Sequence, residues 1–290
     1  TSTITLKAGS ELILDAQGGI GTSTNPLTYA GGAFSATNAT SGDIYIATTG
    51  AATVSANNVD QQFSGGTVDI VSGGNLTLTG NVSTTGAGTV LLDATGTITG
   101  TGTVTGESVR LGTDGNTTSI GSTGTEVKTV SSTLLEASAS TGGIYLSNTG
   151  DVNVQLTANS GAIDFATTGT LNTSGAITAD SISLSSGGVM TIDEDVIADA
   201  GAVTLTVTSA ETNFIHDGTT GTDTISASTT VTIESDDMSL GGDLISGANI
   251  NLYTVEADTD IALGSDTATA NQHDLTASEL TTLSSAGTLT

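Results

Sequence analysis

The residues of this sequence that could most readily bind a metal ion are its clustered acidic residues. Asp and Glu total 30, against three Lys and Arg residues. Some acids stand side by side or two apart, and these candidate metal ligands are Asp193, Glu194, Asp195, Asp236, Asp237, Asp258 and Asp260. Calcium takes about six to eight oxygen ligands at a preformed site. No EF-hand spacing and no Gly-Gly-x-Gly-x-Asp repeat accompanies them. Calcium is therefore the one cofactor that the sequence leaves open.

Catalytic groupings are harder to find. Glycoside hydrolysis uses two carboxylates at a set separation in a substrate groove, and among 30 acids a pair on neighbouring strands arises by chance. Arg110 has no acidic run beside it in the sequence, His216 and His273 lack metal-ligand spacing, and the chain has no cysteine. We therefore expect no enzyme activity and assign no catalytic residue.

Tyr45 and Tyr145 are the candidates for a contact with another molecule. They occur in the matching segments Ile44-Tyr45-Ile46 and Ile144-Tyr145-Leu146. Alternate residues of a strand face opposite sides, so both rings are predicted to face outward. Two interpretations stay open: packing on outward neighbours in adjacent strands, or lateral contact with another molecule or a glycan.

The elements that carry these residues repeat. Residues 20–54 return as residues 120–154, with apolar residues and glycines kept while polar residues change. Repetition of this kind is typical of stacked structural units.

Short pairs of apolar residues with one residue between them recur every 19 to 24 positions, as in Ile44/Ile46, Val68/Ile70 and Val90/Leu92. Glycine and β-branched residues dominate, and no sustained helical periodicity appears. The pattern predicts an all-β fold, a parallel β-helix (β-solenoid) of about 14 coils, with about 19–24 residues per coil. An antiparallel sandwich is the main competitor.

We expect one continuous β-solenoid over residues 1–290. Both ends of the sequence show strand patterns, which indicates a segment of a longer rod or a subunit that stacks end to end. One helical turn is predicted at residues 277–281, bulging from the rod. There Thr276 and Glu279 have capping-box spacing, and Leu275 with Leu280 has the spacing of a hydrophobic staple.

The net charge of −27 excludes nucleic acid and anionic membranes as simple electrostatic partners. No apolar run is long enough to cross a bilayer as a helix, so we expect no membrane insertion. The simplest interpretation of the charge is a solvated surface that keeps the molecules soluble and apart.

The segments Ile20 to Leu27 and Ile120 to Val127, the Gly-x-Ile-Tyr-Ile element and the stretch Leu263 to Leu289 resemble the repeats of filamentous-haemagglutinin-type exoproteins, giant bacterial surface adhesins. The resemblance implies a right-handed parallel β-helix, export through an outer-membrane pore, and a role as an adhesin, fibre or matrix element on the bacterial cell surface.

The sequence thus predicts a structural or adhesive shaft of an extracellular fibre, serving surface attachment or a biofilm matrix. Expected partners are further copies, end to end or laterally, the continuation of a longer chain, and surface glycans. The alternative is a β-helix that binds or cleaves polysaccharide along one face.

Overall fold

A computed structural model describes residues 6–7, 9–209, 213–216, 223–241, 244–256, 260–263 and 272–290. The chain forms two compact units, Thr1–Thr149 and Gly150–Thr290, which are described separately below as unit 1 and unit 2.

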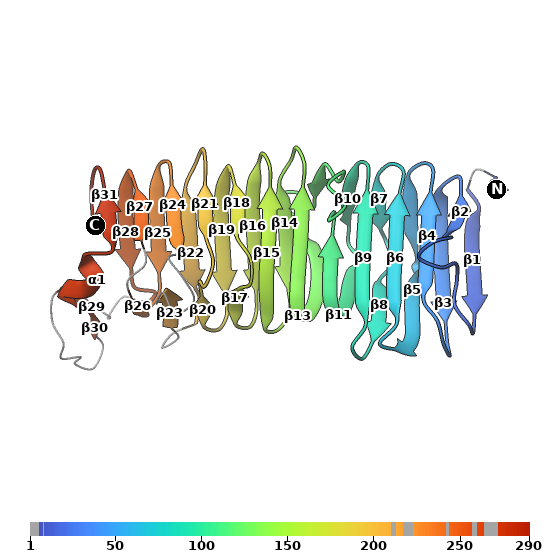
Figure 1. Cartoon of the computed structure of the whole chain (residues 1–290), viewed down its shortest axis with the longest axis horizontal. Coiled ribbons are helices and arrows are strands. Elements are labelled where there is room, and N and C mark those ends of the chain that lie inside the picture. Colours follow the sequence, from blue (N-terminus) through green and yellow to red (C-terminus); the bar gives the residue numbers. More distant parts are fainter. Residues whose placement is uncertain are drawn as a thin grey trace. The chain divides into compact units, whose positions relative to one another are not determined.

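Unit 1 consists of short strands that pair in parallel with strands one coil away (Figure 1). In chain order these are β1 (Glu11–Ala16), β2 (Leu27–Tyr29), β3 (Gly32–Asn38), β4 (Ile44–Thr48), β5 (Ala52–Ser64), β6 (Thr67–Ser72), β7 (Leu76–Leu78), β8 (Val82–Thr85), β9 (Thr89–Ala94), β10 (Thr97–Gly100), β11 (Thr103–Leu111), β12 (Ser119–Ile120), β13 (Val127–Ala139) and β14 (Ile144–Asn148).

These strands build three stacks, because a chain that winds in coils brings each strand over its equivalent in the previous coil. Stack A contains β2, β4, β6, β9 and the second halves of β11 and β13. Stack B contains the first halves of β1, β3 and β5, followed by β7, β10, β12 and β14. Stack C contains the second halves of β1, β3 and β5, then β8 and the first halves of β11 and β13.

Unit 2 is built in the same way and adds a single helical turn (Figure 1). Its elements are β15 (Val152–Ala158), β16 (Ala162–Thr167), β17 (Leu171–Thr173), β18 (Ile177–Ala179), β19 (Ser181–Ser186), β20 (Met190–Thr191), β21 (Val196–Ala198), β22 (Val203–Val207), β23 (Asn213–His216), β24 (Thr224–Ala227), β25 (Thr230–Glu234), β26 (Asp237–Leu240), β27 (Leu244–Gly247), β28 (Asn249–Tyr253), β29 (Asp260–Leu263), β30 (Gln272–Leu275), α1 (Ala277–Leu280) and β31 (Leu283–Ser285).

Three stacks also run through unit 2. Stack D is β16, β19, β22, β25 and β28. Stack E runs from β15 through β17, β20 and β23 to β26, and stack F from β15 through β18, β21, β24 and β27 to β31. A separate parallel pair, β29 with β30, precedes α1.

The core of each unit is a column of aliphatic side chains. In β4 and β14 the burial alternates along the strand, and Ile44 and Ile144 are completely buried. Since each burial removes apolar surface from water, stacked Ile, Val and Leu supply most of the driving force. The predicted all-β parallel solenoid is confirmed.

The predicted number of coils was too high, because the described residues make about 11 turns instead of about 14. Register partners are 19 residues apart at Ile163 and Ile182, but 28 apart at Val203 and Val231 and 38 apart at Ile245 and Leu283. Some coils are therefore longer than the predicted 19 to 24 residues. The longest step contains β29, β30 and α1.

The predicted helical turn is confirmed at Ala277–Leu280. Thr276 accepts the Glu279 backbone N–H, and the Glu279 side chain accepts the Thr276 backbone N–H at 2.8 Å. The second carboxylate oxygen of Glu279 accepts the backbone N–H of Leu240 at 3.1 Å. No residue of α1 is buried, in agreement with a turn that lies outside the core.

The two copies of the internal repeat make the same local excursion. Ile20 pairs with Ile44 and Leu27 pairs with Ile46, so residues 21–26 loop out opposite the single residue Tyr45. In the second copy Ile120 pairs with Ile144 and Val127 with Leu146. Each excursion closes with a small antiparallel bridge, Thr22 to Asn25 and Ser122 to Thr125.

The two excursions belong to different stacks. Ile44 continues through Val68 in stack A, whereas Ile144 is preceded by Ile120 and Ile98 in stack B. The 100-residue repeat is thus not a whole number of coils. Equivalent residues of the two copies therefore lie on different faces of the solenoid.

Candidate functional site

The outer surface of stack A holds the most varied chemistry in unit 1. Successive strands place Tyr45, Asp69, Leu91, Arg110 and Glu136 in one register file, each opposite the next. We call this row the Tyr45 file. Neighbouring members are about 4.8 Å apart because that is the spacing of paired strands. The file combines an aromatic ring, two carboxylates and a guanidinium.

Tyr45 is half-buried between the fully buried Ile44 and Ile46, so its ring faces outward as predicted. Its hydroxyl donates to Asp43 at 3.5 Å. Burial raises the pKa of the Tyr45 phenol, and the negative charges of Asp43 and Asp69 raise it further. The ring is therefore a neutral hydrogen-bonding platform at physiological pH.

Tyr145 has the same burial in β14 but lies in stack B. The sequence places the two tyrosines at equivalent repeat positions, and the structure does not bring them onto one file. The two rings therefore project from different faces of the solenoid, and one flat partner surface cannot contact both rings.

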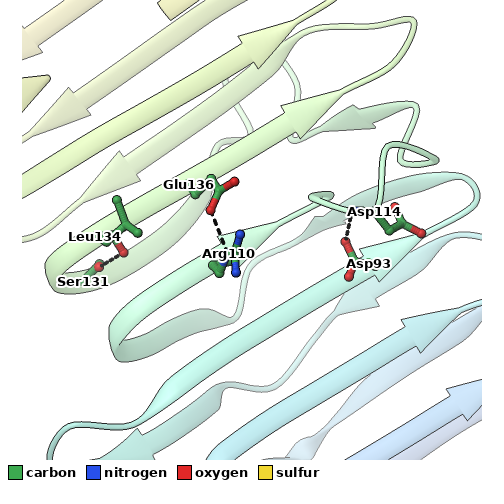
Figure 2. Close-up of polar contacts among 6 residues, drawn as sticks. All are labelled: Asp93, Arg110, Asp114, Ser131, Leu134 and Glu136. Atoms are coloured by element: carbon green, nitrogen blue, oxygen red, sulfur yellow. Dashed lines mark hydrogen bonds and ion pairs between the residues drawn. The ribbon is translucent and has the colours of Figure 1, made fainter. Parts of the chain in front are cut away.

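Asp93 is the most buried carboxylate near the Tyr45 file, with 7% of its surface exposed. It follows Leu92 in β9 and stands opposite Val71 of β6. Its Oδ1 accepts the backbone N–H of Asp114 at 3.2 Å (Figure 2). Burial raises the pKa of Asp93 to about 6, with smaller contributions from the charges of Asp114 and Asp69. Burial also raises the pKa of Asp69.

The loop after β11 covers Asp93 because it is tied down on both sides. Gly112 donates its N–H to the Leu92 carbonyl at 2.8 Å. The Thr117 hydroxyl donates to the Ala94 carbonyl at 3.0 Å and accepts the Ala94 N–H at 3.1 Å. Gly112 has φ +68, and a Cβ there would lie 2.3 Å from the Ser138 carbonyl, so only glycine fits.

Arg110 and Glu136 form an ion pair at the end of the Tyr45 file, with Nε and Oε2 2.7 Å apart (Figure 2). They are 26 residues apart in sequence but directly opposed in β11 and β13. The Ser131 hydroxyl donates to the Leu134 carbonyl at 2.7 Å and fixes the corner before Glu136. The apparent isolation of Arg110 in the sequence was therefore misleading, since its acidic partner, Glu136, comes from the next coil.

Two of the candidate calcium ligands of unit 2, Asp195 and Asp236, use a carboxylate oxygen to accept backbone N–H groups. The Asp195 carboxylate accepts the Thr224 N–H at 2.8 Å. Asp236 accepts the N–H groups of Val255 and Glu256 at 2.8 and 2.9 Å. The backbone amides of Asp193 and Glu194 both donate to the Thr173 hydroxyl, at 2.8 and 3.1 Å.

The remaining acidic candidates are scattered. Asp237 is exposed at the start of β26, Asp260 begins β29, and Asp258 lies outside the described residues. Within the described ranges, no three His, Cys, Asp or Glu side chains are grouped so that they could hold a metal ion.

Sequence reasoning missed what many Asp and Asn side chains do. They cap backbone N–H groups one coil away, as Asp43 does for Thr67 at 2.8 Å and Asn81 does for Thr103 at 2.9 Å. Corner amides have no strand partner, and an unpaired buried amide is costly. The sequence pattern that could have predicted these caps is an Asp or Asn placed one coil length before a residue at a turn.

In the part of the chain that the structure describes, no helix is long and apolar enough to cross a membrane. Comparison with protein-family models, with curated proteins and with solved structures finds no match to this chain.

Proposed function

We propose that this chain is a structural and adhesive shaft of an extracellular bacterial surface fibre, of the kind to which filamentous-haemagglutinin-type repeats belong. Its stability comes from bonds between each coil and the next, and the same bonds can be repeated over any number of coils. Repeat architectures of this kind suit long, mechanically continuous surfaces.

The observation that carries the proposal is the recurrence of coil-to-coil capping. The Asp151 carboxylate accepts the Thr170 N–H at 2.8 Å, 19 residues ahead, and Asn75 accepts the Thr97 N–H at 3.1 Å, 22 residues ahead. Asp and Asn side chains, which in other proteins often form ligand-binding or catalytic sites, here bond one coil to the next. Negative charge at the exposed turns keeps such shafts soluble.

The proposed partners follow from this role: further copies, the continuation of a longer chain, and the glycans of a surface to which the fibre attaches. In this proposal calcium acts as a counterion among exposed carboxylates, without a dedicated protein cage.

The test is negative-stain electron microscopy of the native material from the producing cells, combined with binding of the purified chain to cell surfaces and glycan-coated beads. We expect uniform fibres, unchanged by a calcium chelator, and surface binding. Isolated short particles that bind no surface would contradict the proposal.

A second candidate is a polysaccharide-binding or polysaccharide-cleaving module, and the Tyr45 file favours it. One ring, an Arg and Glu pair, and a buried carboxylate with a pKa of about 6 lie on one outer surface. Incubation with acidic and neutral polysaccharides, followed by measurement of new reducing ends and of unsaturated products, tests this candidate. Release of either product by wild type, but not by Asp93→Asn, would move it ahead of the shaft.

A further inference from the structure

The loop between β11 and β12 presents the dipeptide Asp114-Gly115 to solvent. Both residues are exposed. Gly115 has a φ of +80, a left-handed conformation that glycine adopts most readily, and nothing lies within 4 Å of the position that a Cβ would take there. The peptide nitrogen of Gly115 therefore belongs to a residue with open space around it and no side chain to hinder a reaction.

The Asp114 carboxylate is folded back along the chain. Its Oδ1 accepts the backbone N–H of Asn116 at 2.9 Å, and its Oδ2 accepts the side-chain amide of Asn116 at 2.9 Å. A carboxylate that bonds to the amide two residues ahead closes a ring around the peptide in between. Cγ of Asp114 is thus held beside the nitrogen of Gly115.

Two features of this arrangement favour a reaction between the two groups. Each carboxylate oxygen accepts a hydrogen bond from Asn116, so negative charge that develops on an oxygen during attack at Cγ is stabilised. The N–H of Gly115 donates to the Gly112 carbonyl at 3.3 Å, longer than the usual ~2.9 to 3.0 Å, so the nitrogen is only weakly held.

We propose that Asp114 is a site of spontaneous isomerisation, at which the folded loop converts aspartate to isoaspartate. The nitrogen of Gly115 attacks Cγ of the protonated carboxyl group. The N–Cγ bond forms, the Cγ–OH bond breaks, and the hydroxyl leaves with the amide proton as water. Water then adds to the main-chain carbonyl carbon of residue 114 in the cyclic imide and breaks its bond to nitrogen. The product has the same mass and charge, but Cβ of residue 114 now belongs to the main chain.

The added main-chain atom lies between two anchors of the loop. On one side the N–H of Asp114 donates to Asp93 at 3.2 Å (Figure 2), and on the other Thr117 bonds to Ala94. Strand β9 carries both Asp93 and Ala94, so the separation of the anchors is set by that strand. A longer chain between them cannot follow the same path, and isomerisation should loosen the cover over Asp93. The reaction depends on the loop alone and not on the role of the chain as a shaft.

The chain supplies its own reference site. Asp199 is also an exposed acid, but it is followed by Ala200, whose Cβ hinders closure of the imide ring. The other Asp-Gly pair, Asp217-Gly218, lies outside the described residues.

The test incubates the full chain at neutral pH over several weeks. Trypsin cleaves after Arg110 and Lys128, so Asp114 is the one aspartate in peptide 111–128. A protein isoaspartyl methyltransferase labels isoaspartate, and electron-transfer fragmentation assigns it to single residues. Isoaspartate at Asp114 should accumulate on the order of tenfold faster than at Asp199, and at least as fast as in synthetic peptide 111–128, because the loop holds the reacting atoms together.

Three variants separate the chemistry from the fold. Asp114→Glu keeps the charge but would have to close a six-membered ring, so the product should be lost. Asp114→Asn loses ammonia in place of water, a better leaving group from a neutral side chain, and should give isoaspartate faster. Asn116→Ala removes the side-chain donor to Oδ2 and should slow the reaction several-fold. Circular dichroism melting verifies folding, and Asn116→Ala replaces Asp114→Glu if that variant does not fold.

A rate at Asp114 no higher than at Asp199, or well below that of the synthetic peptide, would overturn the proposal, because the fold would then suppress the reaction. An equal rate in wild type and Asn116→Ala would contradict the activation of the carboxyl group by Asn116. Hydrogen exchange of aged and fresh chain tests the loosening: the amides of Ala94 and Asp114 should exchange faster in the isoaspartyl form, and unchanged exchange would show that the loop accommodates the added atom.

Discussion

The carboxylate of Asp195 accepts the backbone N–H of Thr224 at 2.8 Å, although 29 positions separate the two residues. Val196 and Ile225, the next residues of each segment, are register partners in β21 and β24. The acid that the sequence suggests as a calcium ligand thus closes the corner of a neighbouring coil.

Asp195→Ala should lower the free energy of unfolding by about 1 kcal/mol, because the Thr224 amide loses its acceptor. Asp195→Asn keeps an oxygen at the same place and should lose less. Urea denaturation monitored by circular dichroism measures both. The control is Asp199→Ala, since Asp199 is an exposed acid of the same unit. An equal effect of Asp195→Ala and Asp199→Ala would contradict the capping role.

Asp93→Asn should change how stability depends on pH. The folded-state pKa of Asp93 is raised from 3.8 to about 6 by burial. A raised carboxyl pKa means that the folded state binds the proton more tightly, so the contribution of this group to stability is present below about pH 4 and lost as pH rises through about 6.

The asparagine variant carries no charge at this position and keeps an acceptor for the Asp114 amide. It should therefore be more stable than wild type at pH 7, by on the order of 2 kcal/mol, with the difference shrinking toward pH 4. Thermal melts from pH 4 to 8 measure the difference, with Asp199→Asn as the control. A difference that stays constant with pH would show that Asp93 is not the titrating group.

Gly121→Ala should destabilise unit 1 more than Gly124→Ala. Both glycines have positive φ, +65 and +75, so both substitutions strain the backbone by about 1 kcal/mol. A Cβ at Gly121 would also lie 2.4 Å from the Tyr145 carbonyl, whereas nothing lies within 4 Å of one at Gly124. Equal shifts in the urea midpoint would mean that the excursion at residues 121–126 relaxes around the added methyl.

Tyr45→Ser and Tyr145→Ser should act independently, because the rings lie in different stacks. If the tyrosines contact other molecules, surface binding falls with each substitution and the melting temperature stays unchanged. If they pack on outward neighbours, melting temperature falls and binding per folded molecule is kept. A double mutant that departs from the sum of the single mutants would contradict the separation of the two sites.

Much of the fold could be predicted from particular residues. The pair Ile44 and Ile46, and its recurrence as Ile144 and Leu146, predicts short strands with one buried side, since side chains alternate along a strand. The capping box of Thr276 and Glu279 predicts α1, because both partners lie within one helical turn. In both cases the interacting residues are close together in the sequence, so their spacing alone predicts the local structure.

Coil length was not predictable in the same way. The 38-residue step from Ile245 to Leu283 accommodates β29, β30 and α1 outside the stack, and the spacing of apolar pairs elsewhere does not reveal it. The register between coils depends on the residue at which the chain rejoins the stack after each excursion. Packing against the preceding coil selects that residue.

The sequence by itself determined the class of the protein: an acidic, repetitive, all-β solenoid whose aliphatic residues face inward and in which Tyr45 and Tyr145 face outward. The tertiary structure alone decided which outward residues meet. Arg110 meets Glu136 from 26 residues away, and Tyr45 is separated from Tyr145 because the 100-residue repeat ends on a different stack. The physical reason is that side-chain direction follows from alternation along one strand, whereas neighbours across strands depend on the length of every intervening turn.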